Sequence, residues 1–312
     1  MIEAPLSPEL ADALAALRTG QVIGLPTETV YGLAGDAENP AAIARIFDLK
    51  QRPSDHPLIV HIAEAGLLDR YARAIPDTAY RLADAFWPGP MTLILRRHPD
   101  VLDAVTGGQD SIGLRVPAHP VAQRLLHAFG RGLAAPSANR FGRISPTRAE
   151  HVRDEFGDQV PIVLDGGDCP VGIESTIVDL TGATPRILRP GRIHRDDIAD
   201  LIGPVTLGPG SDSPRAPGML AAHYAPRTPL RLASRTEIAA DRQHPVLAIA
   251  TLPAETRGIA LPDEPKAYAR GLYAALRSLD AIGAEAILAE QPPDDDAWSA
   301  VNDRLRRAAQ AV

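Results

Sequence analysis

The sequence predicts an α/β fold with one main sheet, followed by a smaller α/β domain. Apolar runs typical of buried strands alternate with amphipathic helical stretches through the first two thirds of the chain, and the alternation resumes near its end. The chain has 312 residues, 45% of them hydrophobic, which is enough for a full core. We therefore expect a main domain at 1–203, a connecting segment at 204–226 and a small domain at 227–312.

The elements of the main domain follow from capping residues and apolar spacing. Ser7-Pro8 and Asn39-Pro40 each combine a capping side chain with a proline, which predicts two helix starts. Further helical periodicity lies at 78–86, 121–129 and 147–156. Apolar runs predict strands at 22–25, 58–62, 91–95, 112–116, 133–135, 162–164 and 176–180.

The end of the chain contains a second set of elements. Residues 203–226 include five prolines and four glycines with little periodicity, which indicates a linker or an ordered covering segment. After it, strands are predicted at 230–232, 246–250 and 286–289, and helices at 268–279 and 298–309.

Composition excludes several classes of protein. The single cysteine, Cys169, cannot form an internal disulfide, and no Cys/His cluster has metal-binding spacing, so we expect no metal held by side chains. Residues 1–20 lack the pattern of a signal peptide, and no run of about 18 apolar residues occurs, so we expect a cytoplasmic protein without a membrane contact. A net charge of -7 and 4% aromatic residues argue against a nucleic-acid platform.

Basic residues near predicted strand and helix ends are candidates for ligand binding. Lys50 is one of two lysines among 32 basic residues, and with Arg52 it closes a predicted helix. These two cations either complement the dipole of that helix or point towards the phosphates of a ligand. Arg115 lies inside a predicted strand and needs an anionic partner, which is either a structural Asp or Glu or a ligand carboxylate. His61 also lies in an apolar strand, where a satisfied core histidine is the commoner outcome.

Hydroxyl, amide and guanidinium groups lie at four other predicted strand ends. They are Thr27 and Thr29, Ser137 and Asn139 with Ser145, Ser175 and Thr176, and Arg189. Because α/β sheets bind ligands at the carboxyl ends of strands, these groups suggest a shared pocket for a polyanion. The phosphate loop, the dinucleotide turn, the nucleophile elbow and the zinc helix are all missing from the sequence.

Seven ordered segments resemble the threonylcarbamoyl-AMP synthase family. They are PTETVYGL at 26–33, KQR at 50–52, PLIVH at 57–61, RVP at 115–117, PSAN at 136–139, ESTIVD at 174–179 and LRPG at 188–191. The resemblance to the family's YrdC-like domain covers about residues 5–203. Segments at 217–226, 272–277 and 301–305 are similar to the linker and C-terminal domain of the longer form. The resemblance implies a twisted mixed sheet with flanking helices and a small Rossmann-like domain.

The resemblance also implies site residues. Those around L-threonine would be Thr29, His61, Arg115, Ala135 and Ser175. Those holding ATP would be Lys50, Arg52, His56, Ser111, Ser137, Asn139, Ser145, Arg189 and Tyr224, with Lys50 and Arg52 as the catalytic pair. His56 stands where the family usually has asparagine, and its imidazole can donate one hydrogen bond. Tyr224 would reach back over ATP, which makes the linker a lid.

The implied reaction joins L-threonine, bicarbonate or CO₂ and ATP into threonylcarbamoyl-AMP, with release of pyrophosphate, for N6-threonylcarbamoyladenosine in tRNA. Bicarbonate is implied by the resemblance alone. Mg²⁺ would be held through the ATP phosphates, and a tRNA threonylcarbamoyl transferase would receive the product, so contact with tRNA is compatible with the activity but not required. Two alternatives remain. One is a carbamoyltransferase-type adenylation domain acting on another amine or on carbamoyl phosphate. The other is an RNA-binding module that uses Arg140, Arg143, Arg148 and Arg153.

Overall fold

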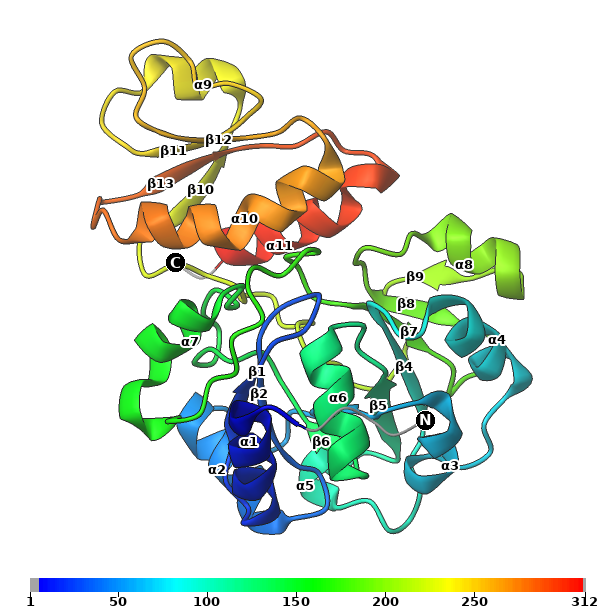
Figure 1. Cartoon of the computed structure of the whole chain (residues 1–312). Helices are drawn as coiled ribbons and strands as arrows, with labels where there is room; N and C mark the ends of the chain where they lie inside the picture. Colours follow the sequence, from blue (N-terminus) through cyan, green and yellow to red (C-terminus); the bar gives the residue numbers. More distant parts are fainter. Residues whose placement is uncertain (1–5, 311–312) are drawn as a thin grey trace.

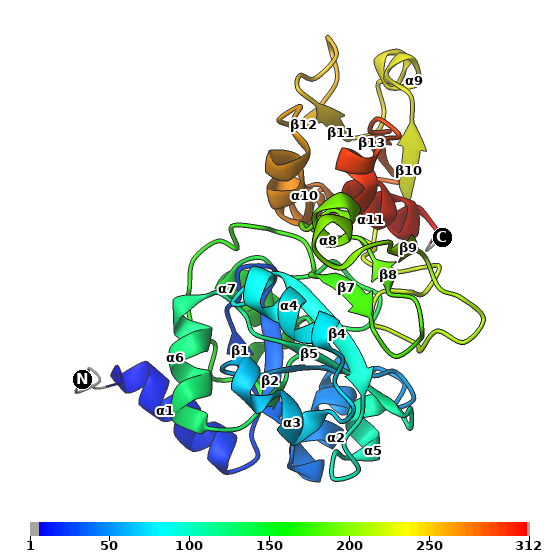
Figure 2. The ribbon, with the colours of Figure 1, turned by 90° about the vertical axis from the view of Figure 1, so that its right-hand side faces the viewer.

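The protein contains two sheets, each covered by its own helices (Figures 1 and 2). The computed structural model describes residues 6–310. Residues 1–5 of the N-terminal stretch discussed above lie outside this range. None of the helices within 6–310 is long and apolar enough to cross a lipid bilayer.

The larger sheet has nine strands in the order β1-β2-β6-β3-β5-β4-β7-β8-β9. They are β1 (Ile23–Leu25), β2 (Gly32–Asp36), β3 (Ile59–His61), β4 (Met91–Arg96), β5 (Ser111–Arg115), β6 (Leu133–Ala134), β7 (Thr176–Asp179), β8 (Arg186–Arg189) and β9 (Thr206–Leu207). The sheet contains both parallel pairs, such as β3 with β5, and antiparallel pairs, such as β4 with β5. The sheet is therefore mixed, as the resemblance implied.

Helices cover both faces of this sheet. They are α1 (Pro8–Arg18), α2 (Pro40–Lys50), α3 (Leu68–Tyr71), α4 (Asp77–Phe86), α5 (Asp103–Thr106), α6 (Pro120–Phe129), α7 (Ala149–Phe156) and α8 (Arg195–Ile202), with 3₁₀ turns at Ala65–Leu67 and Gly157–Gln159. Leu33 packs in the core cluster of α2 and α4, whereas its neighbour Ala34 packs in that of α1 and α6. Because successive strand residues point to opposite faces, the two clusters lie on opposite sides of the sheet.

The two predicted helix starts are confirmed by their caps. Ser7 Oγ accepts a hydrogen bond from the Leu10 amide at 3.4 Å, and Pro8 follows as the first helical residue. Asn39 Oδ1 accepts from the Ala41 amide at 2.9 Å at the start of α2. These side chains satisfy amides that the first helical turn leaves without a partner.

The smaller domain has a four-stranded parallel sheet in the order β10-β13-β11-β12. Its strands are β10 (Leu230–Ala233), β11 (Val246–Ile249), β12 (Gly258–Leu261) and β13 (Ile287–Glu290). Its helices are α9 (Arg235–Ala240), α10 (Pro265–Asp280) and α11 (Ser299–Ala309), with a 3₁₀ turn at Asp296–Trp298. Helices α10 and α11 lie on the side of this sheet that faces the larger domain (Figure 1).

The structure corrects one predicted strand and adds others. Residues 162–164 form a single bridge, between Val163 and Gly24, rather than a strand. Pairing is limited to Gly24, whose amide donates to Ile162 O at 2.9 Å and whose carbonyl accepts from the Leu164 amide at 3.0 Å. The sequence predicted neither β12 nor β2, which pairs antiparallel with β1. It also did not predict β9, which pairs with β8 at the start of the expected linker.

Candidate active site

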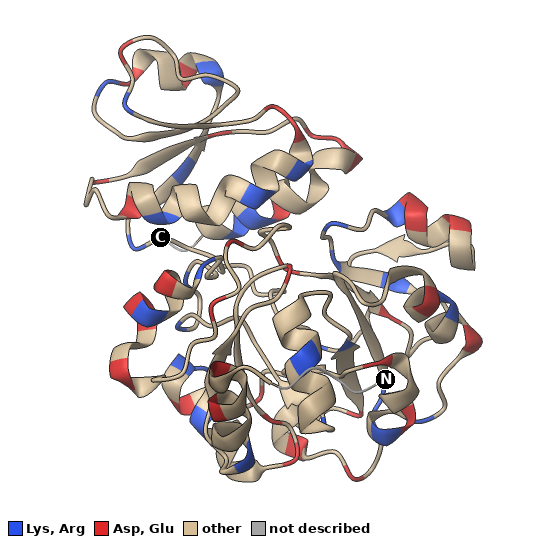
Figure 3. Ribbon diagram, in the orientation of Figure 1, with Lys and Arg blue, Asp and Glu red and all other residues tan. Residues whose placement is uncertain are grey.

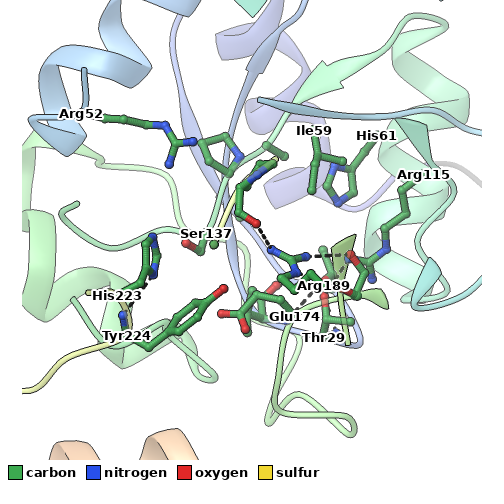
Figure 4. A pocket seen from close by; sticks show the side chains of 18 residues that line it. Thr29, Arg52, Ile59, His61, Arg115, Ser137, Glu174, Arg189, His223 and Tyr224 are labelled. Carbon is green, nitrogen blue, oxygen red and sulfur yellow. Dashed lines mark hydrogen bonds between the residues drawn. The ribbon is translucent and has the colours of Figure 1, made fainter. Parts of the chain in front are cut away.

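A pocket opens where the ends of several central strands meet the segment 217–224. Nine of the predicted site residues line it: Thr29, Arg52, His61, Arg115, Ala135, Ser137, Ser175, Arg189 and Tyr224. In Figure 4, Arg52 and Tyr224 lie on one side and His61 and Arg115 on the other, with Arg189 between them. The five residues predicted around threonine all belong to this set.

Arg115 occupies the last position of β5 and is buried. Its Nη2 donates to Glu28 Oε1 at 2.6 Å, its Nη1 to Thr29 Oγ1 at 2.8 Å and its Nε to Gly89 O at 3.1 Å. The second oxygen of Glu28 accepts from the Ala118 amide at 3.0 Å. Of the two partners left open by the sequence, a structural carboxylate is therefore present, and Arg115 is held rigidly at the pocket wall.

His61 lies on β3 beside Arg115, and its position in the register pairs the two residues directly. Burial, and then the Arg115 charge, lower the pKa of His61 to about 3, so the imidazole is neutral. Its Nδ1 is buried without a hydrogen-bond partner among the described residues. A buried polar atom without a partner is uncommon in a folded protein, so Nδ1 is available to a ligand.

Arg52 and Arg189 are buried guanidiniums without a carboxylate partner anywhere in residues 6–310. Arg52 Nη2 donates to Pro57 O at 3.0 Å, and its Nε has no partner. Arg189 donates to Ser175 O at 3.0 Å, to Ser175 Oγ at 3.1 Å and to Pro217 O at 3.0 Å. Burial lowers the pKa of Arg52 to about 10 and also lowers that of Arg189. Two buried cations without a direct ion pair favour an anionic ligand at this end.

The linker closes one side of the pocket through Pro217, Gly218, His223 and Tyr224. Tyr224 is 1% exposed, has a left-handed backbone with φ of 63° and leaves its hydroxyl without a partner in the described structure. A side chain on Gly218, where φ is +81°, would place its Cβ 2.0 Å from that hydroxyl. A strained backbone conformation persists only where the surrounding structure enforces it, and such residues cluster at functional sites. The conformation of Tyr224 therefore indicates a functional role for the linker.

Lys50, His56, Ser111, Asn139 and Ser145 do not line the pocket. Lys50 Nζ donates to the carbonyls of Ser137 and Asn139, so it supports the loop that brings Ser137 to the pocket. Burial, and then the Arg52 charge, lower the pKa of Lys50 well below its usual value. Ser145 Oγ donates to Glu174 Oε1, behind the pocket wall. His56 packs edge-on against the Phe141 ring at 5.2 Å.

Three residues of the site were missed by the sequence analysis as functional groups. Glu28 supplies the counter-charge of Arg115, and Glu174 and His223 line the pocket. Glu28 belongs to the motif PTETVYGL, and Glu174 belongs to the motif ESTIVD. A search of these motifs for an acidic partner of Arg115 would have found Glu28. His223 had only its position beside Tyr224 as a signal.

Two of the four arginines proposed for RNA binding are paired with acids. Arg148 contacts Asp168 at 2.9 Å and Glu150 at 3.3 Å, and Arg153 lies 3.9 Å from Asp165. Basic and acidic positions are interspersed over both domains (Figure 3). A basic stripe would be expected of a nucleic-acid surface, so the pattern does not favour that alternative.

Two acidic side chains near the pocket each form an ion pair with an arginine. Glu28 is bound by Arg115, and Glu174 by Arg304 at 2.8 Å. Within the described part of the chain, no group of three or more His, Cys, Asp or Glu side chains could hold a metal ion. A divalent ion at this site would therefore depend on ligands that arrive with the substrate.

Both parts of the chain match known protein families. A family model described as telomere recombination (Sua5/YciO/YrdC) matches residues 15–191, and one described as threonylcarbamoyl-AMP synthase, C-terminal domain, matches residues 193–310. The chain is 38% identical to the threonylcarbamoyl-AMP synthase of Pyrococcus abyssi, over 94% of this chain and 92% of the relative. It is also 38% identical to the Bacillus subtilis protein of that name, over 97% and 93%.

One solved structure is similar over both domains, and another is similar over part of the chain. The crystal structure of P. abyssi Sua5 complexed with L-threonine is similar with a TM-score of 0.90 and 36% identity, covering 98% of this chain and 96% of that one. The crystal structure of Escherichia coli YciO, with a TM-score of 0.53 and 28% identity, covers 61% of this chain and 92% of that one.

Proposed function

The chain belongs to the threonylcarbamoyl-AMP synthase family, and we propose that the pocket between β1, β5, β7 and the linker performs that synthesis with the residues described above. The activity is formation of L-threonylcarbamoyl-adenylate from L-threonine, bicarbonate or CO₂ and ATP. One observation carries the assignment of the pocket: two buried guanidiniums, of Arg52 and Arg189, face it without a carboxylate partner in residues 6–310. A triphosphate supplies a direct negative partner for both guanidiniums.

L-Threonine would bind at the end formed by Thr29, His61, Arg115, Ala135 and Ser175. The substrate carboxylate would approach Arg115, whose Nη1 and Nη2 each carry a second N–H besides the one given to Thr29 or Glu28. The neutral His61 has its free Nδ1 at the same end. A crystal structure of the similar Pyrococcus abyssi protein in complex with L-threonine supports the choice of ligand.

ATP would bind at the end formed by Arg52, Ser137, Arg189 and Tyr224. Lys50 would act on the nucleotide through the Ser137 and Asn139 carbonyls that it holds, or directly after a small shift of that loop. Ser111, Asn139, Ser145 and His56 remain predicted ATP residues whose side chains lie outside the pocket lining here.

The chemistry needs positioning more than a protein nucleophile. The threonine amine combines with bicarbonate, losing water, or with CO₂, losing a proton, to give a carbamate. An oxygen of the carbamate then attacks the α-phosphorus of ATP and displaces pyrophosphate. Guanidiniums already fixed in the pocket stabilise the charge that develops on the phosphoryl oxygens. This makes the enzyme a nucleotidyltransferase. Mg²⁺ would bind through phosphate oxygens and water, because both nearby carboxylates are paired with arginines.

The linker acts as a lid in this proposal. Tyr224 and Pro217 contact the space that ATP would fill, so ATP enters when the linker is displaced and the linker closes over it afterwards. Closure protects a carbamate and a mixed anhydride, which water would hydrolyse. We place the activity in the cytoplasm, with a tRNA threonylcarbamoyl transferase as the consumer of the product.

Product analysis tests the proposal. Incubation of the protein with ATP, L-threonine and ¹³C-bicarbonate, followed by mass spectrometry, should give an adenylate that carries one ¹³C atom and one threonine. An adenylate without the label, or one formed equally well from another amine, would support the second enzyme alternative instead.

A further inference from the structure

Arg304 lies on α11 of the smaller domain, yet its side chain is 1% exposed and ends beside the pocket of the larger domain. Its Nε donates to Glu174 Oε2 at 2.8 Å, and its Nη2 donates to Glu174 O at 3.4 Å. Its Nη1 donates to Pro190 O at 3.0 Å. One guanidinium therefore joins two separate segments of the larger domain.

In each segment, a residue that lines the pocket is adjacent in sequence to the residue that Arg304 contacts. Ser175 follows Glu174, and Arg189 precedes Pro190. Arg189 is hydrogen-bonded to Ser175 O at 3.0 Å and to Ser175 Oγ at 3.1 Å, so the two segments also meet at the pocket itself. A movement of either segment would change the direction of the Arg189 guanidinium.

Arg304 also contacts the linker residue that lines the pocket. Its guanidinium carbon lies 5.1 Å from the centroid of the Tyr224 ring, a cation–π distance. The ring of Tyr273, on α10, lies 6.0 Å from the same ring. The smaller domain thus touches the lid as well as the strand ends.

The electrostatic effect concerns Glu174. It is the acidic residue among the described lining residues of the pocket. Burial alone would favour the neutral acid, but Arg304, Arg189 and the hydrogen bond from Ser145 lower the pKa of Glu174 to about 2. Tyr273 Oη also donates to Glu174 Oε2, at 2.8 Å. An ionised carboxylate beside a bound triphosphate is repulsive unless a cation neutralises it.

We infer that Arg304 is a positioning residue of the pocket: it holds and neutralises Glu174 so that Arg189 and Tyr224 present a site for the triphosphate. This inference rests on the proposed function for the identity of the ligand. It gives the smaller domain a specific part in binding, because the larger domain alone leaves Glu174 without its main counter-charge.

The test is a double-mutant cycle read out by ATP binding. The dissociation constant of ATP is measured by calorimetry for the parent, Arg304→Met, Glu174→Gln and the double variant, and the KM for ATP is measured beside it. Arg304→Met should weaken ATP binding by at least ~10-fold, since it leaves a buried carboxylate without its counter-charge. The double variant should return to within about threefold of the parent, because both charges are then gone.

Arg306→Met is the matched control. Arg306 is on the same helix but exposed, and it pairs with Asp294 of its own domain at 2.8 Å, so ATP binding should not change. Parental ATP affinity in a folded Arg304→Met protein would overturn the inference, and so would a double variant no better than Arg304→Met, since a merely structural arginine is not rescued by removing Glu174.

A milder variant covers the case in which Arg304→Met does not fold. Tyr273→Phe keeps the buried ring and removes one hydrogen bond to Glu174, and it should weaken ATP binding about threefold. Unchanged ATP affinity in that variant would then overturn the inference. Failure of the proposed function is seen separately, as pyrophosphate release by the parent that does not depend on threonine and bicarbonate.

Discussion

Arg115 Nη2 donates to Glu28 Oε1 over 2.6 Å, with the two side chains only 5% and 8% exposed. This ion pair identifies Glu28 as the counter-charge of Arg115, an arginine within a strand. It also means that a threonine carboxylate would join an existing ion pair rather than create one. The binding end of the pocket is thus rigid before the substrate arrives.

Glu28→Gln tests this relationship. Without the carboxylate, Arg115 is buried and uncompensated, so the free energy of unfolding should fall by about 3–5 kcal/mol. L-Threonine should then raise the melting temperature of the variant more than that of the parent, because its carboxylate replaces the lost charge. Glu38→Gln is the control, since Glu38 pairs with the half-exposed Arg70. Equal threonine effects in the parent and in Glu28→Gln would contradict the placement of threonine at Arg115.

Loss of single cations should reduce turnover strongly. Lys50→Ala, Arg52→Ala and Arg115→Ala should each lower pyrophosphate release by at least ~10²-fold, because each removes a group that anchors phosphate or carboxylate, directly or through the 137–139 loop. Lys266→Ala, at the other lysine, is exposed and should behave as the parent. Near-parental turnover in all three variants would remove the basis for the site.

Stability should fall in acid because of His61. Its pKa is about 3 in the folded protein and near 6.5 when unfolded, so between these values the unfolded state binds more protons and the free energy of unfolding falls as pH falls. The contribution is up to about 1.4 kcal/mol per pH unit. His61→Gln should reduce the slope by that amount when urea unfolding is measured between about pH 4.5 and 6.5. His223, with a pKa also lowered to about 3 by burial, keeps part of the slope.

The exposed His127 provides the control for that series. His127→Gln should leave the pH slope of the unfolding free energy at the parental value. A His61→Gln slope identical to the parent's would show that His61 is not held neutral in the folded protein.

Gly218→Ala should block closure of the linker. Its Cβ would lie 2.0 Å from the Tyr224 oxygen, so the variant cannot keep both residues where they are. The KM for ATP should rise by about 10-fold or more, as expected when an interaction with the lid is lost. Gly208→Ala is a matched control, because φ is +79° there and nothing lies within 4 Å of the new Cβ. Similar effects in both variants would assign the loss to backbone strain rather than to the lid.

The sequence was most informative where local rules apply. The caps at Ser7 and Asn39 fixed two helix starts, and nine predicted site residues converged on one pocket. Partners that lie far apart along the chain could not be predicted from the sequence. Glu28 is 87 residues from Arg115, and Glu174 is 130 residues from Arg304, so neither contact has a local signature. The position of Lys50 behind the 137–139 loop likewise depends on how that loop packs against the end of α2.

The central claim is that this pocket joins three substrates in one reaction, and pyrophosphate release measures it most directly. The complete mixture of protein, Mg²⁺-ATP, L-threonine and bicarbonate should release pyrophosphate steadily. Omission of threonine, or of bicarbonate from CO₂-free buffer, should reduce the rate to background, and Arg52→Ala should do the same in the complete mixture. Pyrophosphate release at an unchanged rate without threonine or without bicarbonate would contradict the account.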